Sequence, residues 1–506
     1  MNRLKTITVL VVFWLCSCSG TPKKVLPTLE PNYYTQANHN RVAAEWEPAL
    51  GTMVVWPLSI PYKLAVELAK DGHLYTLVVD ETAERQATEW YKRWGMDMQR
   101  VTFVHAPQGT DAWWVRDWGP SAVFTPKKQM KLGDGKYPYA TPFTDRACND
   151  SLRFLNMTPE RKRRLENGEK VNLTEIDDKA TGPMGEQLGM EILELPFINT
   201  GGNVLSDGLG TAFSTCVIAN ENRYDGISEK RLRQLNKALL GITQYHIISN
   251  FEKYGIQHID CFMKLLDEET LLVAEPPSDH ELHNIYENIV TDELSRLKSA
   301  YGRPYTILRI KTDRYRGERL AAYTNSLIVN KTVYVPLFDI AQDSLALKRW
   351  SEVMPGYAIK GFAFPLLEEP ITTPEMKAHY RTYGWNQGDA LHCRVRAIWD
   401  PEMLFMSLKK IDAKDAKNDK QQVHATIIDY SQKGLEKGKA QLFWRLQGSK
   451  AWNVVPLEQQ TDSNHFFAEI PADTTEHRVE YYISAVSKSG RTETRPKTAP
   501  LGTYSF

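Results

Sequence analysis

The stretch from Thr52 to Val79, TMVVWPLSIPYKLAVELAKDGHLYTLVV, decides the fold class of this chain. Its apolar runs at 52–56 and 74–79 have the length and composition of buried strands, and 62–70 between them has the spacing of an amphipathic helix. Three later apolar runs repeat the strand pattern: Leu327–Val329, Val333–Pro336 and Ala358–Phe362. Short strands that alternate with helices from Trp46 to about Met406 predict an α/β fold.

Length and composition limit the number of domains and the class of protein. The 506 residues predict two to four domains, and 42% hydrophobic with 25% charged residues is typical of folded globular proteins rather than multi-span membrane proteins. Lys plus Arg equals Asp plus Glu, 62 against 62, so no overall charge favours a nucleic-acid partner.

A second domain is predicted at the C-terminus. Residues 409–422, KKIDAKDAKNDKQQ, have the composition of a solvated linker. Four strand candidates follow with turn residues and no helical pattern between them: Ala425–Tyr430, Ala440–Leu446, His465–Ile470 and Val479–Val486. We therefore expect a small immunoglobulin-like β-sandwich over residues 423–506.

The N-terminus has the features of a targeting segment. Two basic residues precede an apolar run that is too short for a permanent span, and Leu15-Cys16-Ser17-Cys18 resembles a bacterial lipobox. Residues 1–18 are predicted to be a lipoprotein signal peptide with Cys18 as the acylated residue, and residues 19–40 a tether. Ser19 favours the outer membrane of a Gram-negative bacterium, so we expect an extracytoplasmic, membrane-anchored protein. An ordinary signal peptide cut nearby is the alternative.

Cysteine usage favours a nucleophile over a disulfide scaffold. Beyond the signal region the chain has four cysteines and no CxxC pair: Cys148, Cys216, Cys261 and Cys393. If Cys393 serves chemistry, an odd number remains, and at least one other thiol is free.

Five segments concentrate polar residues within apolar surroundings. They are Trp113–Pro120 (WWVRDWGP), Thr200–Asn203 (TGGN), His258–Cys261 (HIDC), Tyr323–Ser326 (YTNS) and Gly388–Cys393 (GDALHC). Each alone is a weak signal, because a turn, a cap or a core histidine accounts for it.

Together the segments fit a guanidinium substrate. Two carboxylates, Asp117 and Asp260, can bind the edges of this planar cation while Trp114 covers its face. A Cys393 thiolate can attack the central carbon at neutral pH if a neighbouring cation lowers its pKa. His258 can then protonate the departing ammonia and later activate water.

On these motifs the chain resembles the Porphyromonas-type peptidylarginine deiminases and their agmatine deiminase relatives in the guanidino-modifying (pentein) superfamily, over roughly residues 40–405. The resemblance implies a five-bladed α/β-propeller over residues 41–408 with a central active site. It further implies no metal and no cofactor. The roles it assigns are Cys393 as nucleophile, His258 as acid and base, Asp117 and Asp260 as guanidinium ligands, Asn325 as a pocket residue, and Asn203, Tyr323 and Trp114 as substrate-binding residues.

Details of the motifs favour peptidyl substrates over agmatine. Agmatine enzymes typically carry Glu before GGN and Gly-Gly-Asn-Ile before His-Cys, whereas this chain has Thr200 and Gly388-Asp389-Ala390-Leu391. The segments YTNSL at 323–327, MPGY at 354–357 and VEYYIS at 479–484 resemble the peptidylarginine type. In place of the Arg-Pro-Arg clamp for a C-terminal carboxylate, the corresponding region offers only Arg146. Peptides or proteins with accessible arginine are the expected partners, and agmatine is the alternative substrate.

Three readings from other classes stay open on the residues alone. His258, Asn325 and Cys393 could form a cysteine-peptidase triad. His258, Cys261, His392 and Cys393 could bind zinc, although an adjacent His-Cys pair gives poor chelate geometry on a strand. The chain could also be a surface adhesin that binds through its sandwich and carries an inactive body.

Overall fold

The computed structural model describes residues 39–506 with gaps at 110, 138–141, 144–152, 155–162, 164–166, 168–174, 253–255, 365–373, 375–383, 413–419, 461–462 and 472–477. The predicted signal peptide with Cys18, nearly all of the tether, and Arg146 lie outside the described residues. No helix in the described part of the chain is both long and apolar enough to cross a membrane.

The strand–helix–strand unit predicted from residues 52–79 is confirmed. Strand β2 (Ala49–Val55) and strand β3 (His73–Val78) pair in parallel, and helix α1 (Tyr62–Asp71) connects them. The apolar side chains of α1 recur at helical spacing and are buried: Leu64, Ala65, Leu68 and Ala69. This apolar face packs the helix against β2 and β3.

Five sheets repeat one pattern, in which an antiparallel pair is followed by a parallel strand. The bounds, in sheet order, are β21 (Arg396–Trp399), β2, β3, β4 (Val101–His105); β1 (Arg41–Val42), β5 (Ser121–Phe124), β6 (Met130–Lys136), β9 (Ile192–Ile198); β10 (Leu205–Ser206), β11 (Thr211–Thr215), β12 (Gln244–Ile248); β13 (Met263–Asp267), β14 (Thr270–Glu275), β15 (Thr306–Lys311); and β18 (Leu327–Val329), β19 (Thr332–Pro336), β20 (Ala358–Phe362).

Helices precede the parallel strands of these sheets. They include α2 (Glu81–Arg93), α6 (Thr181–Leu188), α7 (Val217–Tyr224), α8 (Glu229–Leu235), α9 (His283–Asn288) and α10 (Gln342–Val353). Such a crossover is what a parallel connection requires, because the chain must return across the face of the sheet. The mixed α/β class is therefore confirmed, while the circular arrangement of a five-bladed propeller stays a prediction.

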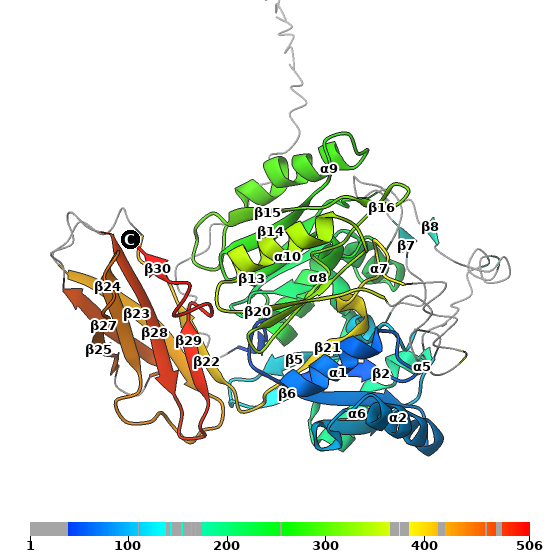
Figure 1. Cartoon of the computed structure of the whole chain (residues 1–506), viewed down its shortest axis with the longest axis horizontal. Coiled ribbons are helices and arrows are strands. Elements are labelled where there is room, and N and C mark those ends of the chain that lie inside the picture. The colour runs from blue at the N-terminus through cyan, green and yellow to red at the C-terminus, as the bar shows by residue number, and fades with distance from the viewer. Residues whose placement is uncertain are drawn as a thin grey trace, which may run out of the picture.

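The two ends of this α/β part meet in one sheet. Strand β21, near residue 400, runs antiparallel to β2, with Ala397 opposite Thr52. This pairing places the segment that precedes β21, which carries the Cys393 motif, beside the first strands of the chain (Figure 1).

The C-terminal strands form two antiparallel sheets over one hydrophobic core. One sheet contains β22 (Leu404–Leu408), β23 (Lys420–Asp429), β27 (His465–Pro471) and β26 (Glu458–Gln459); the other contains β25 (Asn453–Pro456), β24 (Gln441–Leu446), β28 (Val479–Val486), β29 (Thr492–Arg495) and β30 (Tyr504–Ser505). All four predicted strands are present, and β28 alternates buried and half-buried residues. The immunoglobulin-like assignment stays a prediction.

The boundaries of this second part differ from the predicted ones. Strand β22 pairs with β23, so the sandwich begins at Leu404 rather than after residue 422. Composition could not indicate this, because β22 is apolar like the strands before it, and only its pairing partner assigns it to the sandwich.

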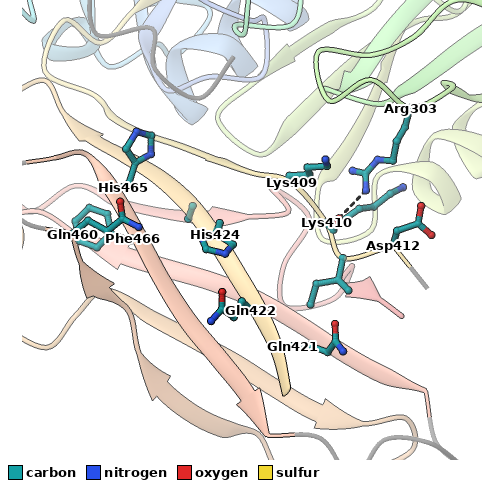
Figure 2. A pocket seen from close by; sticks show the side chains of 12 residues that line it. Arg303, Lys409, Lys410, Asp412, Gln421, Gln422, His424, Gln460, His465 and Phe466 are labelled. Atoms are coloured by element: carbon teal, nitrogen blue, oxygen red, sulfur yellow. Dashed lines mark hydrogen bonds between the residues drawn. The ribbon is translucent and has the colours of Figure 1, made fainter. Parts of the chain in front are cut away.

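The two parts contact each other through ion pairs and a shared pocket. Arg491 binds the Asp400 carboxylate with Nε–Oδ2 2.5 Å, and Arg303 donates to the Lys410 carbonyl at 2.7 Å. Beside this contact lies a pocket of about 500 Å³ lined by residues of the linker, β23 and β27 (Figure 2). None of the predicted catalytic residues line it.

Candidate active site

Each of the five sheets contributes one short turn to a common site. The turn lies directly before the first strand of the antiparallel pair in every case. These turns carry Asp117 in α3 (Val115–Trp118) before β5, Asn203 in η3 (Gly201–Asn203) before β10, His258 and Asp260 at η5 (Ile259–Cys261) before β13, Asn325 before β18, and Cys393 in η8 (His392–Arg394) before β21.

Glycines let these turns approach closely. A Cβ added at Gly201 would lie 2.1 Å from the Arg116 carbonyl oxygen, so no larger residue fits between α3 and η3. Turn α3 contacts both η3 and η8, and η3 also contacts η5. The GGN motif therefore serves close backbone packing.

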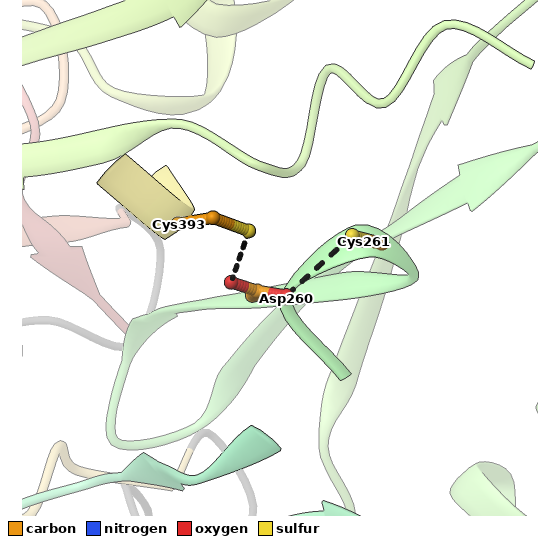
Figure 3. A group of neighbouring side chains, drawn as sticks. All are labelled: Asp260, Cys261 and Cys393. Atoms are coloured by element: carbon orange, nitrogen blue, oxygen red, sulfur yellow. Dashed lines mark hydrogen bonds between the residues drawn. The ribbon is translucent and has the colours of Figure 1, made fainter. Parts of the chain in front are cut away.

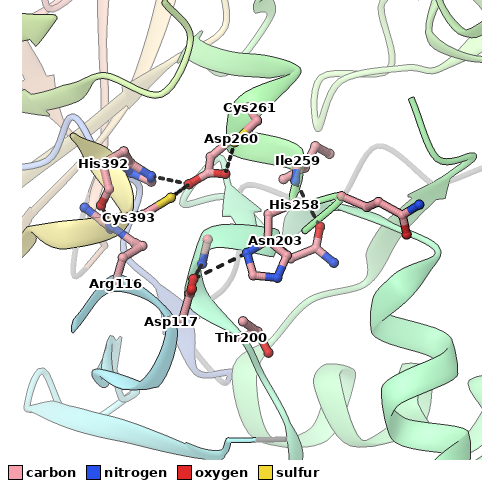
Figure 4. A network of polar contacts seen from close by, with 12 residues as sticks. Arg116, Asp117, Thr200, Asn203, His258, Ile259, Asp260, Cys261, His392 and Cys393 are labelled. Carbon is pink, nitrogen blue, oxygen red and sulfur yellow. Dashed lines mark hydrogen bonds and ion pairs between the residues drawn. The ribbon is translucent and has the colours of Figure 1, made fainter. Parts of the chain in front are cut away.

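Three charged groups surround a single point beside Gly202. A Cβ placed on that residue would lie 2.5 Å from Asp117 Oδ1, 3.0 Å from His258 Nδ1 and 3.2 Å from Asp260 Oδ2. The Gly202 amide donates to Asp117 Oδ1 at 2.9 Å, and His258 Nδ1 lies 3.5 Å from the same oxygen (Figure 4). All three side chains are buried. The structure thus brings the two predicted guanidinium ligands and the predicted acid–base residue together.

The Cys393 thiol lies within this group. Its Sγ is 3.8 Å from Asp260 Oδ2 and receives the Asn325 Nδ2 donor at 3.2 Å. Asn325 Oδ1 accepts from the His392 amide at 2.9 Å, so one amide side chain holds both the sulfur and the backbone of the turn. Cys393 is 2% exposed.

Two buried arginines anchor the Cys393 turn. Arg394 binds the Asp389 carboxylate with both Nε (2.8 Å) and Nη2 (2.6 Å), which fixes the loop before the cysteine. Arg396 donates to the carbonyls of Pro120 and Arg116, which fixes η8 against the turn that carries Asp117.

The pKa of the nucleophile differs from the expectation. A hydrogen bond with Cys261 lowers the pKa of Cys393, but burial and the negative charges of Asp260 and Asp117 outweigh it and raise the pKa to about 11. The expected lowering by a neighbouring cation is therefore wrong for the protein without substrate. The physical reason is that His258 pairs with Asp117, while a carboxylate lies against the sulfur.

His258 is held in its cationic form. Burial lowers its pKa, but the Asp117 carboxylate and, further away, Asp260 and Glu221 raise it to about 9. Its Nε2 has no hydrogen-bond partner among the described residues. At neutral pH this side chain is an acid with one N–H available to a ligand.

A chain of charges extends from Asp260 into the protein. His392 contacts Asp260 Oδ2 through Nδ1 at 2.7 Å and Glu45 Oε2 through Nε2 at 2.9 Å, and Lys264 Nζ lies 2.8 Å from the same Glu45 oxygen. Burial raises the pKa of Asp260, but hydrogen bonding and charge from His392 lower it below its ordinary value. The carboxylate is thus ionised and oriented.

The four predicted substrate-binding residues have different outcomes. Asn203 Oδ1 accepts from the amides of Thr215 (3.0 Å) and Ile259 (3.1 Å), so it positions the His258–Asp260 turn. The Tyr323 hydroxyl donates to Asp343 at 2.7 Å and is engaged away from the site. Trp114 is half-buried and caps α3 beside Asp117. Arg146 lies outside the described residues.

The geometry also bears on the alternative sites. Asn325 contacts the two sulfurs of Cys261 and Cys393 rather than His258, so the peptidase triad is not assembled. Instead of the four-residue zinc set, the donors that converge in the described part of the chain are Asp260, Cys261 and Cys393, whose ligand atoms lie within 4.8 Å of one another (Figure 3).

Sequence reasoning missed several buried polar residues of the site. Glu45 and Glu221 are distant from the motifs along the chain, Lys264 lies three residues after the His258–Cys261 motif, and Cys261 was considered only as a zinc ligand. Lys264 gave the clearest signal, because a lysine inside the apolar strand MKLLD requires a buried partner. Glu221, on α7, gave none.

Comparisons with known proteins show the family of this chain. The family described as Porphyromonas-type peptidyl-arginine deiminase matches residues 41–367, more than half of the chain. A Yersinia pseudotuberculosis protein provisionally named agmatine deiminase is 28% identical over 363 residues, 63% of this chain and 88% of that protein. A Vibrio parahaemolyticus protein with the same provisional name is 26% identical over 212 residues, 36% of this chain. The chain thus spans 58% of that Vibrio relative.

Solved structures show the same fold. An agmatine deiminase of Enterococcus faecalis aligns with TM-score 0.52 and 16% identity, covering 72% of this chain and 96% of its own. A provisionally named arginine deiminase from Porphyromonas gingivalis aligns with TM-score 0.52 and 18% identity, covering 72% and 99%.

The family whose model matches this chain, and the solved structures that share its fold, are named as deiminases. The chain belongs to the Porphyromonas-type peptidyl-arginine deiminase family of the pentein superfamily.

Proposed function

We propose that the protein hydrolyses the guanidinium group of arginine side chains in peptides or proteins to citrulline, with release of ammonia. The observation that carries this proposal is the convergence of Asp117, His258 and Asp260 on one buried point beside the Cys393 thiol. A planar cation is the ligand that two such carboxylates suit.

Substrate binding also supplies the missing activation of the nucleophile. Without a ligand, burial and then the carboxylate charges of Asp260 and Asp117 raise the pKa of Cys393 and keep the thiol protonated. A guanidinium bound between Asp117 and Asp260 introduces a positive charge beside the sulfur, which favours the thiolate. The thiolate then attacks the central carbon of the guanidinium, and the Asn325 amide stabilises the sulfur until the bond forms.

His258 serves both half-reactions. As an imidazolium it gives its proton to the departing ammonia, which leaves an amidino group on Cys393 through a thioether bond. The neutral imidazole then takes a proton from water, and the hydroxide attacks the amidino carbon. Collapse breaks the C–S bond and releases citrulline. These steps use only side chains and water.

Peptidyl arginine is preferred as the substrate for two reasons. The family match is to peptidyl-arginine deiminases, and Thr200 stands where agmatine-type enzymes carry Glu before GGN. Agmatine stays the second candidate, because the relatives by sequence carry that name. A single arginine, Arg146, in the region of the carboxylate clamp predicts weaker selection for C-terminal arginine.

The deciding experiment compares four substrates side by side: a peptide with C-terminal arginine, a peptide with internal arginine, free arginine and agmatine. Ammonia and citrulline from either peptide support the proposal. Turnover of agmatine alone would move the protein to the second candidate, and an absence of ammonia from all four would refute deimination.

We further propose that the enzyme works outside the cytoplasm on an N-terminal lipid anchor at Cys18. Support comes from the lipobox spacing at residues 15–18 and the Pro-containing segment that follows it. Peptides with exposed arginine are available there, and hydrolysis needs no energy-carrying cosubstrate.

A further inference from the structure

We propose that Cys261 and Cys393 form a reversible disulfide, which makes Cys261 a modification site that protects and silences the nucleophile. The chemistry of the pair does not require the proposed function. Only the loss of activity rests on Cys393 being the nucleophile.

The geometry of the two thiols carries this inference. Both are free and buried, whereas Cys216 is disulfide-bonded. Their sulfur atoms lie within 4.8 Å of each other, and the same Asn325 Nδ2 lies 3.2 Å from one sulfur and 3.4 Å from the other. Each cysteine lies in a one-turn 3-10 helix, and bond formation requires the side chains to rotate until the sulfurs are about 2.05 Å apart.

The surroundings hold the pair together. Asp260 lies between the two turns, with Oδ1 3.5 Å from Cys261 Sγ and Oδ2 3.8 Å from Cys393 Sγ (Figure 3). His392 fixes Asp260 through the contact between its Nδ1 and Asp260 Oδ2. Asp260 in turn holds both thiols in place. The deimination steps above do not use the Cys261 thiol, so they do not explain why it lies beside Cys393.

The electrostatics set the order of reaction. The hydrogen bond with Cys393, burial and the charge of Asp260 raise the pKa of Cys261 well above its ordinary value. The same hydrogen bond opposes the rise for Cys393, so burial and negative charge raise the pKa of Cys393 only to about 11. Cys393 therefore ionises first and is the thiol that meets an oxidant. Cys261 is the resolving thiol.

A hydroperoxide is the oxidant, and the steps balance as follows. The Cys393 thiolate attacks one oxygen of hydrogen peroxide; the S–O bond forms, the O–O bond breaks, and hydroxide leaves to take up the thiol proton. The Cys261 sulfur then attacks the sulfenic sulfur; the S–S bond forms, the S–O bond breaks, and water leaves with the Cys261 proton. Two thiols are oxidised and one peroxide becomes two waters.

The disulfide restricts further damage. A sulfenic acid without a resolving partner proceeds to sulfinic acid, which dithiothreitol does not reduce. With Cys261 in place, oxidation stops at a state that thiols reverse. The expected difference between the wild type and a protein without this thiol lies in recovery after reduction rather than in the rate of inactivation.

The test treats the full chain with hydrogen peroxide at pH 9, where more of Cys393 is thiolate, and maps its peptides without reduction. We expect a cross-linked pair of peptides that carry residues 261 and 393, loss of ammonia release, and recovery with dithiothreitol. Cys261→Ser should recover about tenfold less activity, with Cys393 found as sulfinic acid. Cys393→Ala, treated in the same way, should give no cross-link to Cys261.

The peptide map detects the Cys261–Cys393 disulfide whether or not the protein releases ammonia. Failure of the proposed function can therefore be distinguished from failure of this inference. Absence of the cross-link in the oxidised wild type would overturn the proposal. Equal recovery of Cys261→Ser and the wild type would overturn it as well. If Cys261→Ser does not fold, the map of the wild type decides.

Discussion

Replacing Gly202 by alanine should disable the site while leaving the fold intact. Gly202 lies in the 3-10 turn η3, so its backbone accepts alanine. The added methyl would lie 2.5 Å from Asp117 Oδ1, against an ordinary contact of about 3.5 Å, so the carboxylate must retreat by about 1 Å. The methyl also occupies the point on which His258 and Asp260 converge.

The magnitude follows from these two effects. Misplacement of a catalytic group by about 1 Å costs roughly 100-fold in rate, and partial filling of the guanidinium position adds to the loss. We expect kcat/KM for ammonia release to fall by about 10²–10³, and the free energy of unfolding to fall by about 1–3 kcal/mol from overpacking.

A matched control separates the site from general effects of alanine. Gly182 lies exposed in helix α6, and a Cβ there would meet no atom within 4 Å. Gly182→Ala should leave kcat/KM unchanged, because the added methyl meets no neighbouring atom. A Gly202→Ala protein that retains more than about a third of the wild-type kcat/KM would refute the placement of substrate beside Gly202.

Three further changes test other parts of the reasoning. Cys393→Ala should abolish ammonia release yet still bind an arginine peptide in calorimetry, because both carboxylates remain; undetectable binding would contradict their role. Glu221→Gln removes a negative charge that raises the pKa of His258, so the alkaline limb of the kcat/KM profile should move from about 9 to lower pH and kcat/KM at pH 9 should fall several-fold; an unmoved limb would exclude this coupling. Protonated His258 contributes to the free energy of unfolding. This contribution is complete below the unfolded pKa of about 6.5 and is lost as the pH rises through about 9. In thermal unfolding, Glu221→Gln should lower the pH at which this contribution is lost. Cys18→Ala should move the protein from the detergent phase to the aqueous phase in Triton X-114 partitioning, and two aqueous proteins would disprove the anchor.

Helices and strands that depend on short-range sequence patterns could be predicted. The runs at 52–56, 62–70 and 74–79 became β2, α1 and β3, because apolar periodicity and burial coincide there. The strands predicted at 327–329 and 333–336 follow the same rule, and the strand at 358–362 is also present although its residues are exposed or half-buried. The start of the sandwich at Leu404 was not predictable, since it depends on pairing with a strand beyond the linker.

The site residues also divide into those that the sequence could predict and those that it could not. Asp117, His258, Asp260, Asn325 and Cys393 stand in motifs, and the structure gathers all five.

The residues that support these five could not be predicted from a motif. Glu221 reaches Thr200 Oγ1 at only 3.5 Å and acts on His258 through charge, and Glu45 reaches the site through His392. The role of Cys261 depends on a neighbour 132 positions along the chain, which no local pattern can indicate.

The resting site is arranged against premature reaction. Two carboxylates, Asp117 and Asp260, face one thiol, and the cation of His258 is paired at 3.5 Å with Asp117. The pKa of Cys393 is therefore raised to about 11, and the thiolate is scarce until a cationic ligand enters. The same scarcity slows oxidation of the nucleophile, and Cys261 limits the oxidation that does occur. Both devices depend on Asp260, because it binds substrate, suppresses the thiolate and lies against both sulfurs. An Asp260→Asn protein should accordingly lose guanidinium binding while its two thiols become easier to oxidise, and these opposite effects separate a functional carboxylate from one that only supports the fold.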